Sequence, residues 1–494
     1  MMMTTHTDEL IPSKVEAVLN RQFRLLVGGR LVPALSGASY EVLSPVTETV
    51  IAQVPDAGTD DVEAAVTAAE AARKAWRRTI PADRAAMVQR LADAIEAHAE
   101  ELALLDAIDA GSPINNARND VAMAVANLRM FASFALEMKG TTIPASNNIH
   151  MTLREPIGIV ARIVPFNHPL MFACKIAAPL VAGNCVILKA PDVAPLSSLR
   201  LGELAADVFP EGVLSILVGK GPEVPRAIVR HPKVRRIGFI GSESTGRAIQ
   251  RDAAEAGVKE VTLELGGKNA MLVFPDADLD KAAAGAVAGM NFTWSGQSCG
   301  SNSRLLLHES VADEVTAKVV RIVNALTIGN PLDETCDQGT MISRAQYQKA
   351  LDYIDIAKSE GATVLTGGGR PDGFERGFYV SPTVLADVGP ETRIAREEVF
   401  GPVLSIMTFR TEEEAIAIAN SVEYGLTASV WTENITRAHR VIGELEAGFT
   451  WINGSSRHFP NVPYGGYKAS GIGREESIEE LLSYTELKTV NIML

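Results

Sequence analysis

Little in this 494-residue sequence points to a nucleic-acid-binding protein or to a disulfide-stabilised one. Acidic residues outnumber basic residues by 60 to 46, which gives a formal net charge of −14, and no basic block would attract a phosphate backbone. The four cysteines are too few and too scattered for a disulfide framework, and no Cys/His cluster has the spacing of a metal site. We therefore expect no nucleic-acid partner, no bound metal and a reducing compartment.

The sequence also lacks an uninterrupted apolar run of about 18 residues, the length that a membrane-spanning helix needs. Lys175 interrupts the apolar stretch at 169–188. The N-terminal segment carries early acidic residues and has no continuous apolar core of the kind found in a secretory signal, so we expect a loose tail before a first helix. These features predict a cytoplasmic protein without membrane contact.

What the chain does have is a composition ordinary for globular proteins, with 47% hydrophobic and 21% charged residues. At roughly 150 residues per domain, its length predicts about three domains. Between 60 and 78, apolar residues recur every three or four positions, which predicts a helix with Asp60 or Asp61 as its N-cap. Further helical patterns follow Pro81 and cover 120–138.

After Pro156 the chain changes character, because short apolar runs alternate with helical patterns. This order is typical of a parallel sheet with helices on both faces. The runs lie at 157–164, 185–188, 214–218, 237–240 and 261–265. A second series follows Asn269, with runs at 271–274 and 304–307 and helical patterns at 278–290 and 311–325. We predict two α/β units with a cleft between them, where small-molecule sites usually lie.

Two segments have the pattern of exposed strands. Apolar and polar residues alternate at 149–153, and 487–494 reads as a strand with nothing after it to cover its edge. Pairing of these edges with another subunit and pairing of the two segments with each other both fit the pattern.

The chain contains no G-x-G-x-x-G, the usual fingerprint of a dinucleotide-binding turn. The glycine-rich stretch at 367–373 has the pattern of a surface loop rather than a phosphate cradle. Any dinucleotide must therefore bind without the usual fingerprint.

Cys299 lies in a loop rich in Gly and Ser, within the sequence FTWSGQSCGSNSR. A thiol on such a loop can approach a ligand closely, and neighbouring backbone N–H groups can stabilise an oxyanion. A free cysteine is, however, more often an inert buried side chain. From the residues alone, Cys299 is either a nucleophile or a core residue.

Glu264 and Asn167 are the other candidates for chemistry. Glu264 interrupts an apolar run in VTLELGGKN, and a buried carboxyl group with a raised pKa can serve as a general base. Its alternative is a salt bridge to Lys259 or Lys268. Asn167, in IVPFNHP, can either donate its amide to an oxyanion or form a turn before Pro169.

Seven segments of the chain match a known pattern together and in order, at 165–169, 189–192, 239–246, 264–267, 296–299, 398–402 and 463–475. They resemble the consecutive signatures of the aldehyde dehydrogenase superfamily, and the resemblance extends over about 21–494. It implies an α/β fold with a Rossmann-type parallel-sheet cofactor domain, an α/β catalytic domain and a small β oligomerisation arm. The implied boundaries are 1–134 with 154–262 for the dinucleotide-binding domain, 263–475 for the catalytic domain, and 135–153 with 476–494 for the arm.

The resemblance also implies an NAD(P)-dependent oxidation of an aldehyde to the carboxylic acid. Cys299 is then the nucleophile that forms a thiohemiacetal and a thioester, and Glu264 is the base that activates water to hydrolyse the thioester. Asn167 becomes an oxyanion donor beside the backbone N–H of Cys299. Because a free thiol is only a few per cent ionised at neutral pH, the site must favour the thiolate.

The same resemblance implies the cofactor contacts. In FIGSESTGR a strand ends and a helix begins, so Ser242 and free N–H groups can meet a pyrophosphate. Many family members have Glu at the position of Asp192, yet a carboxylate there still favours NAD over NADP because it repels a 2′-phosphate. The implied cofactor-binding residues are Pro165, Phe166, Lys189, Asp192, Gly241, Ser242, Leu265, Glu398 and Phe400.

The substrate channel is where this chain departs from the family. His168, Lys175, Arg457 and His458 could form a cationic channel for an acidic aldehyde. An apolar tunnel for an aromatic aldehyde is the alternative. The implied substrate-binding residues are His168, Phe172, Trp294, Arg457 and His458, with Phe166 and Phe459 as further aromatic candidates.

Two rival functions stay open at this point. The first is a coenzyme A-acylating aldehyde dehydrogenase, against which Glu264 argues because it activates water. The second is a catalytically silent binding or structural homologue. A homodimer or homotetramer is expected, and the sequence does not indicate which aldehyde is physiological or how the protein is regulated.

Overall fold

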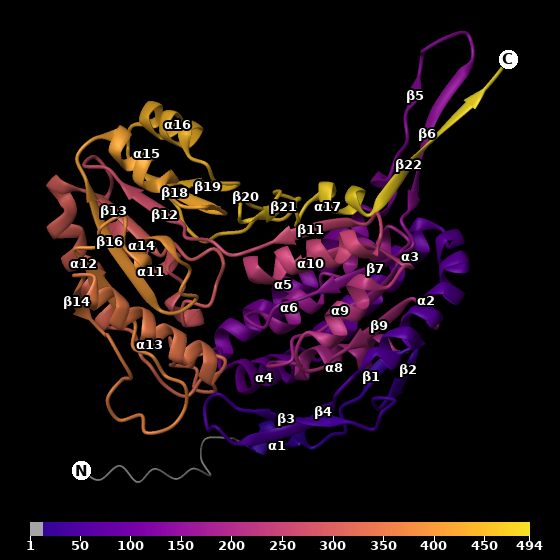
Figure 1. Cartoon of the computed structure of the whole chain (residues 1–494), viewed down its shortest axis with the longest axis horizontal. Helices are drawn as coiled ribbons and strands as arrows, with labels where there is room; N and C mark the ends of the chain where they lie inside the picture. The colour runs from indigo at the N-terminus through magenta and orange to yellow at the C-terminus, as the bar shows by residue number, and fades with distance from the viewer. Residues whose placement is uncertain (1–12) are drawn as a thin grey trace.

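The computed structural model describes residues 13–494, so the N-terminal tail predicted from the sequence lies outside the described residues. Two α/β bodies lie side by side, each built around one sheet, and a three-stranded arm projects from one of them (Figure 1). This arrangement confirms the predicted α/β class. No helix within 13–494 is both long and apolar enough to cross a membrane.

The first sheet has eight strands in the order β2-β1-β9-β8-β7-β10-β11-β21, and its five central strands are parallel. Every residue of β7, β8 and β9 is buried, as strands covered on both faces require. The apolar runs after Pro156 therefore form the predicted parallel sheet. The strands are β1 (Leu25–Val27), β2 (Arg30–Val32), β7 (Ile159–Ile163), β8 (Cys185–Lys189), β9 (Leu214–Leu217), β10 (Val234–Ile240), β11 (Glu260–Glu264) and β21 (Gly471–Ile472).

The helices of this body differ in two places from their predicted bounds. Neither Asp60 nor Asp61 is the N-cap of α2: the cap is Gly58, because Asp61 is the third helical residue and its carboxylate accepts the Gly58 N–H at 2.9 Å. α5 begins before the predicted helix and ends at Ser133, where the short 3-10 helix η2 (Ala135–Glu137) follows. The helices are α1 (Ser13–Leu19), α2 (Thr59–Arg78), α3 (Pro81–Ala97), α4 (Ala99–Ala110), α5 (Ile114–Ser133), α6 (Pro169–Ala173), α7 (Ala177–Val181), α8 (Leu196–Ala205), α9 (Glu223–Arg230) and α10 (Glu243–Ala256).

The second sheet has seven strands in the order β14-β15-β16-β13-β12-β18-β19, all parallel except β14. Its strands are β12 (Ala270–Val273), β13 (Arg304–His308), β14 (Thr363–Thr366), β15 (Thr383–Ala386), β16 (Val403–Phe409), β18 (Thr427–Trp431) and β19 (Phe449–Ile452). The accompanying helices are α11 (Leu279–Gly289), η3 (Phe292–Trp294), η4 (Glu309–Val311), α12 (Ala312–Asn324), α13 (Arg344–Ser359), α14 (Arg393–Arg396), α15 (Glu412–Asn420) and α16 (Ile435–Glu444).

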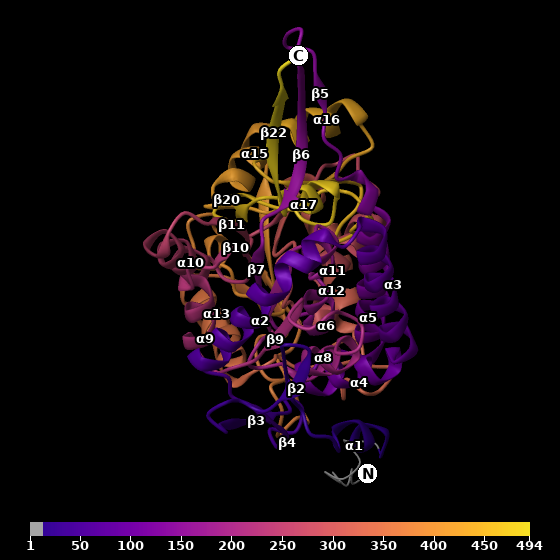
Figure 2. The same ribbon diagram turned by 90° about the vertical axis from the view of Figure 1, so that its right-hand side faces the viewer.

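The arm contains β5 (Thr142–Ile143), β6 (Ile149–Pro156) and β22 (Thr485–Ile492), in the order β22-β6-β5. β22 pairs antiparallel with β6 along its whole length, from Thr485 opposite Pro156 to Ile492 opposite Ile149. Of the two pairings left open by the sequence, the intrachain one is therefore present. Within 13–494 the outer edge of β22 has no strand partner, and the arm extends beyond both bodies in the side view (Figure 2).

The C-terminal segment connects the two bodies. β21 extends the first sheet beside β11, while β20 (Tyr467–Lys468) pairs with β17 (Tyr424–Gly425). α17 (Ile478–Ser483) then leads into β22, and a separate hairpin of β3 (Ser39–Leu43) and β4 (Val50–Pro55) lies near the N-terminal end. This crossing places residues 464–476 against the carboxyl end of β11.

Candidate active site

The carboxyl ends of β7, β10 and β11 meet at one edge of the first sheet, because β10 lies between the other two. Glu264 is the last residue of β11, and Ser242 follows β10 as the N-cap of α10. Loops from the second body close over this edge and leave a strand-end cavity of about 120 Å³. The predicted residues that line it are Pro165, Phe166, Asn167, Phe172, Gly241, Ser242, Glu264, Leu265, Cys299, Glu398 and Phe400.

A second, outer cavity of about 450 Å³ meets the strand-end cavity at Cys299. The predicted residues His168, Phe172, Trp294, Arg457 and His458 line the outer cavity. Five side chains, namely Phe172, Ile240, Glu264, Leu265 and Cys299, line both. The thiol and the carboxyl group are therefore reachable from two sides.

The loop that carries Cys299 is held in place by contacts with residues outside the loop. Asn269 donates its amide to the carbonyl oxygens of Cys299, at 2.7 Å, and of Ser301, at 3.0 Å. Gly296 has a φ of 65°, and a Cβ there would lie 2.1 Å from the carbonyl oxygen of Gly401. The loop therefore requires glycine at 296, and the backbone of Cys299 is fixed in place.

Cys299 is partly exposed to the cavities but removed from bulk water. This desolvation raises the pKa of its thiol to about 11, against a hydrogen bond from Tyr464 and the charge of Lys175, which lower it. The Sγ atom lies 3.7 Å from the hydroxyl oxygen of Tyr464. The sequence reasoning did not single out Tyr464, although it lies within the matched segment at 463–475.

Glu264 is buried, and both its carboxylate oxygens lack a hydrogen-bond partner among residues 13–494. Burial raises its pKa well above the usual range, and the nearby Glu475 raises it further. Neither predicted salt bridge forms: Lys259 donates to the carbonyl oxygens of residues 229 and 231, and the Lys268 ammonium has no hydrogen-bond partner among the described residues. Glu264 thus lines both cavities with a carboxyl group that no described residue engages in a hydrogen bond.

Glu398 and Phe400 close the strand-end cavity from the second body. Glu398 accepts the N–H of Gly267 at 2.9 Å, and a Cβ at Gly266 would lie only 2.2 Å from its other oxygen. The two glycines therefore allow the carboxylate to approach the backbone. Phe400 packs edge-on against Phe166, with ring centroids 5.9 Å apart.

Lys189 and Asp192 do not line either cavity. Lys189 is the last residue of β8, and Asp192 lies in the loop that follows it. Lys189 is buried, which lowers the pKa of its ammonium group, while Asp192 acts in the opposite direction. The Asp192 carboxylate accepts the N–H of Gly221 at 3.2 Å, and its carbonyl oxygen accepts the hydroxyl of Tyr40 at 2.9 Å. Both residues stand at the same sheet edge as Ser242.

Carboxylates contact three of the four basic residues of the predicted cationic channel, namely His168, Lys175 and His458. Lys175 is buried and lies 2.7 Å from Glu475 and 3.2 Å from Glu476. His458 contacts the same Glu476 at 2.8 Å. Helical spacing placed Lys175 near the channel, but its partners lie about 300 residues away, where no local pattern indicates them.

His168 is likewise paired, with its Nδ1 atom 2.8 Å from a carboxylate oxygen of the buried Asp120 on α5. Its ring lies 4.4 Å from that of Trp294 and 5.4 Å from that of Phe172, measured between centroids. Arg457 is exposed and contributes its carbonyl oxygen to the indole N–H of Trp451. Aromatic rings therefore form part of the outer cavity wall, and within 13–494 Arg457 is the one basic residue of the predicted channel without a carboxylate contact.

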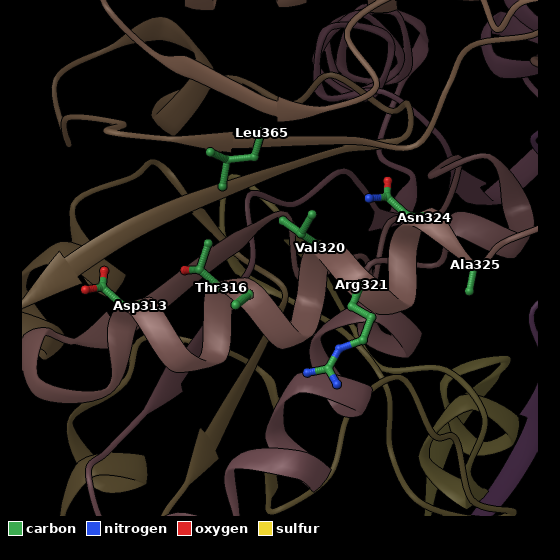
Figure 3. A pocket seen from close by; sticks show the side chains of 8 residues that line it. Asp313, Thr316, Val320, Arg321, Asn324, Ala325 and Leu365 are labelled. Atoms are coloured by element: carbon green, nitrogen blue, oxygen red, sulfur yellow. The ribbon is translucent and has the colours of Figure 1, made fainter.

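A groove of about 740 Å³ lies elsewhere, over α12 and β14 (Figure 3). Asp313, Thr316, Val320 and Asn324 follow one face of α12 below Leu365. None of the predicted site residues lines this groove, so the candidate catalytic and substrate-binding residues are confined to the two cavities between the bodies.

Comparison with known proteins gives consistent matches over nearly the whole chain. A model described as "Aldehyde dehydrogenase family" matches residues 32–490. The chain is 45% identical over 491 residues to the aldehyde dehydrogenase tropH of Talaromyces stipitatus, covering 97% of this chain and 95% of that protein.

Solved structures agree with this match. An aldehyde dehydrogenase from Bacillus cereus in complex with NAD+ superposes with a TM-score of 0.94 at 40% identity, covering 97% of this chain and 98% of that one. The betaine aldehyde dehydrogenase of Staphylococcus aureus in complex with NAD+ gives a TM-score of 0.95 at 34% identity, covering 98% and 97%.

Proposed function

Because the chain belongs to the aldehyde dehydrogenase family, we propose that it oxidises an aldehyde to the carboxylic acid with NAD, using Cys299 as the nucleophile. The observation that carries this proposal is the position of Cys299 and Glu264 at the junction of the two cavities. One cavity can admit the cofactor ring and the other the aldehyde, so both reach the same sulfur atom.

The residues at the edge of the first sheet fit a dinucleotide. The N-terminus of α10, capped by Ser242, presents free backbone N–H groups that suit a pyrophosphate. Lys189 and Asp192 would hold the adenosine ribose, and Glu398 with Phe400 would hold the nicotinamide ribose and ring. The glycines at 266 and 267 keep side chains out of this space. When bound, NAD supplies the acceptor for a hydride.

The chain's own groups perform the remaining steps. The Cys299 thiolate attacks the aldehyde carbon, and Asn167 with the backbone N–H of Cys299 stabilises the oxyanion of the resulting thiohemiacetal. Hydride departure from that carbon leaves a thioester on Cys299. Glu264 then takes a proton from water, the hydroxide attacks the thioester carbonyl, and the carboxylic acid leaves as the thiol is regenerated.

The side chains favour NAD over NADP. The Asp192 carboxylate accepts the N–H of Gly221, and the family resemblance places this side chain beside the ribose hydroxyls. A free 2′-hydroxyl can donate to such a carboxylate, whereas a 2′-phosphate is repelled by it.

For the substrate, the lining of the outer cavity favours a neutral aromatic aldehyde over an acidic one. Trp294, Phe172 and Trp451 supply aromatic walls, and the buried Lys175 is already paired with Glu475 and Glu476. An anionic group on the substrate would have to compete with these carboxylates for Lys175.

We also propose the domain division that the family resemblance implies, which the two sheets and the arm support in outline. It assigns dinucleotide binding to 1–134 and 154–262, the catalytic domain to 263–475, and oligomerisation to the arm at 135–153 and 476–494. The free edge of β22 supports the last assignment, because an unpaired strand edge can extend a sheet of a second copy.

The deciding experiment compares the parent enzyme with Cys299→Ser and Glu264→Gln. With a panel of aromatic, aliphatic and acidic aldehydes, the parent should form NADH and carboxylic acid, and Cys299→Ser should lose turnover. Glu264→Gln should release about one NADH per subunit and then stall, with an acyl group on Cys299 in the intact mass. Undiminished oxidation by Cys299→Ser would refute the mechanism.

Two further readouts separate the rival functions. An acyl-coenzyme A product that forms only when coenzyme A is added would identify an acylating enzyme. A protein that binds NAD but gives no NADH with any aldehyde of the panel would be a silent homologue.

A further inference from the structure

Tyr464 is a buried side chain that contacts the sulfur of Cys299 and that the proposed mechanism leaves without a role. Its hydroxyl oxygen lies 3.7 Å from Sγ, within hydrogen-bond range for sulfur, and among the described residues Sγ is the hydrogen-bond partner of this hydroxyl. Cys299 in turn packs against the cluster of Leu426, Phe449, Trp451 and Tyr464. The contact thus joins the catalytic loop to the C-terminal segment.

The position of this hydroxyl is set by rigid neighbours. The Tyr464 backbone forms both hydrogen bonds of an antiparallel bridge with Glu475, at 2.9 and 2.8 Å. Its ring packs against Phe449, with centroids 5.2 Å apart, and against His458, at 4.6 Å. The phenol therefore cannot swing away from the sulfur without breaking several contacts.

We propose that Tyr464 is a further catalytic residue, whose phenol O–H donates a hydrogen bond to the Cys299 sulfur and stabilises the thiolate before it attacks the aldehyde. This inference rests on the proposed role of Cys299 as the nucleophile. A thiolate has no proton to donate, so in the reactive state the hydrogen bond runs from the phenol to the sulfur.

The charges around the sulfur make such a donor useful. Glu264 and Glu398 face Cys299 and disfavour its ionisation, and Lys175 acts in the opposite direction but is held by Glu475 and Glu476. Burial and the neighbouring thiol keep the pKa of Tyr464 well above its usual range, so the phenol retains its proton over the working pH range. The hydroxyl therefore stays available as a donor.

The test is Tyr464→Phe, which removes the hydroxyl and keeps the ring. We expect the pH midpoint of Cys299 ionisation, followed by thiolate absorbance against a Cys299→Ala background, to rise by about one pH unit. A midpoint higher by one unit lowers the thiolate fraction at about pH 7.5 about tenfold, but each remaining thiolate is about threefold more nucleophilic. The rate of Cys299 alkylation by iodoacetamide at that pH should therefore fall by only about threefold. The acidic limb of kcat/KM should move with the midpoint.

Tyr467→Phe is the matched control, because this tyrosine lies three residues along the same segment with an exposed ring. It should leave the midpoint and the alkylation rate unchanged. If Tyr464→Phe fails to fold, 2,3-difluorotyrosine at position 464 supplies a stronger donor, and the midpoint should then fall. An unshifted midpoint in whichever of these proteins folds would overturn the proposal.

Alkylation and absorbance need no aldehyde turnover. A wrong role for Tyr464 can therefore be distinguished from a wrong proposed function. If Cys299→Ser still oxidises aldehydes, the function is wrong whatever Tyr464 does. If Cys299→Ser is inactive and Tyr464→Phe keeps the parent midpoint, the role of Tyr464 alone is wrong.

Discussion

Glu475 and Arg162 form a buried ion pair, with a carboxylate oxygen 2.8 Å from a guanidinium nitrogen and both side chains under 5% exposed. Arg162 lies in the central strand β7, and Glu475 lies in the segment that crosses between the bodies. The same carboxylate also contacts Lys175 at 2.7 Å. The ion pair therefore anchors the C-terminal segment, which also carries Tyr464 and Glu476, to strand β7 of the first sheet.

Glu475→Gln should destabilise the protein by about 3–5 kcal/mol near neutral pH, because it removes the carboxylate partner of the buried Arg162 and leaves Lys175 with Glu476 alone. Although burial acts to raise it, Arg162 and Lys175 lower the pKa of Glu475 to about 2. Its stabilising contribution is thus complete above the ordinary glutamate pKa and is lost as the pH falls through about 2. Thermal unfolding from neutral to acid pH should show the parent and the variant converging.

Asn167→Ala should lower kcat by about 100- to 1,000-fold while the protein stays folded, because it removes one of two oxyanion donors. Steady-state NADH formation measures the loss, and circular dichroism checks the fold. Alkylation of Cys299 should proceed close to the parent rate, since the oxyanion forms only after attack on a carbonyl. A kcat within threefold of the parent would show that Asn167 is a turn residue.

Asp192→Asn should reduce the preference for NAD over NADP by about tenfold, since one negative charge near a 2′-phosphate is worth at least about 1 kcal/mol. The ratio of kcat/KM for the two cofactors is the measurement. Asp56→Asn is the control, because Asp56 accepts the N–H of Lys220 at 2.9 Å, next to the Gly221 contact of Asp192. Equal changes in both variants would argue against a specific role for Asp192.

Benzaldehyde should be oxidised with a kcat/KM at least about tenfold higher than 4-carboxybenzaldehyde, because Lys175, the buried cation of the outer cavity, is already paired with Glu475 and Glu476. 4-Methylbenzaldehyde controls for size and should behave like benzaldehyde. If the acid is the better substrate and Arg457→Gln raises its KM, the channel is cationic after all.

Much of the fold could be predicted from local pattern. The run at 185–188 and its neighbours became the parallel strands β7 to β11, because a strand buried on both faces must be continuously apolar. The predicted N-cap of α2, Asp60 or Asp61, lies two or three residues after the observed cap Gly58, because the Asp61 carboxylate accepts the Gly58 N–H from inside the helix. The pairing of β6 with β22 stayed undecided, because an exposed strand pattern does not specify its partner.

From the sequence came the family and the candidate reactive groups: a thiol on a small-residue loop, a carboxyl group at a strand end and an amide after another strand. The tertiary structure decided which groups act together. Tyr464 meets Cys299 across 165 positions, and Lys175 meets Glu475 across 300. The physical reason is that residue type and periodicity are local properties, whereas charge pairing and the solvation of a thiol depend on contacts that exist only after the two sheets pack together.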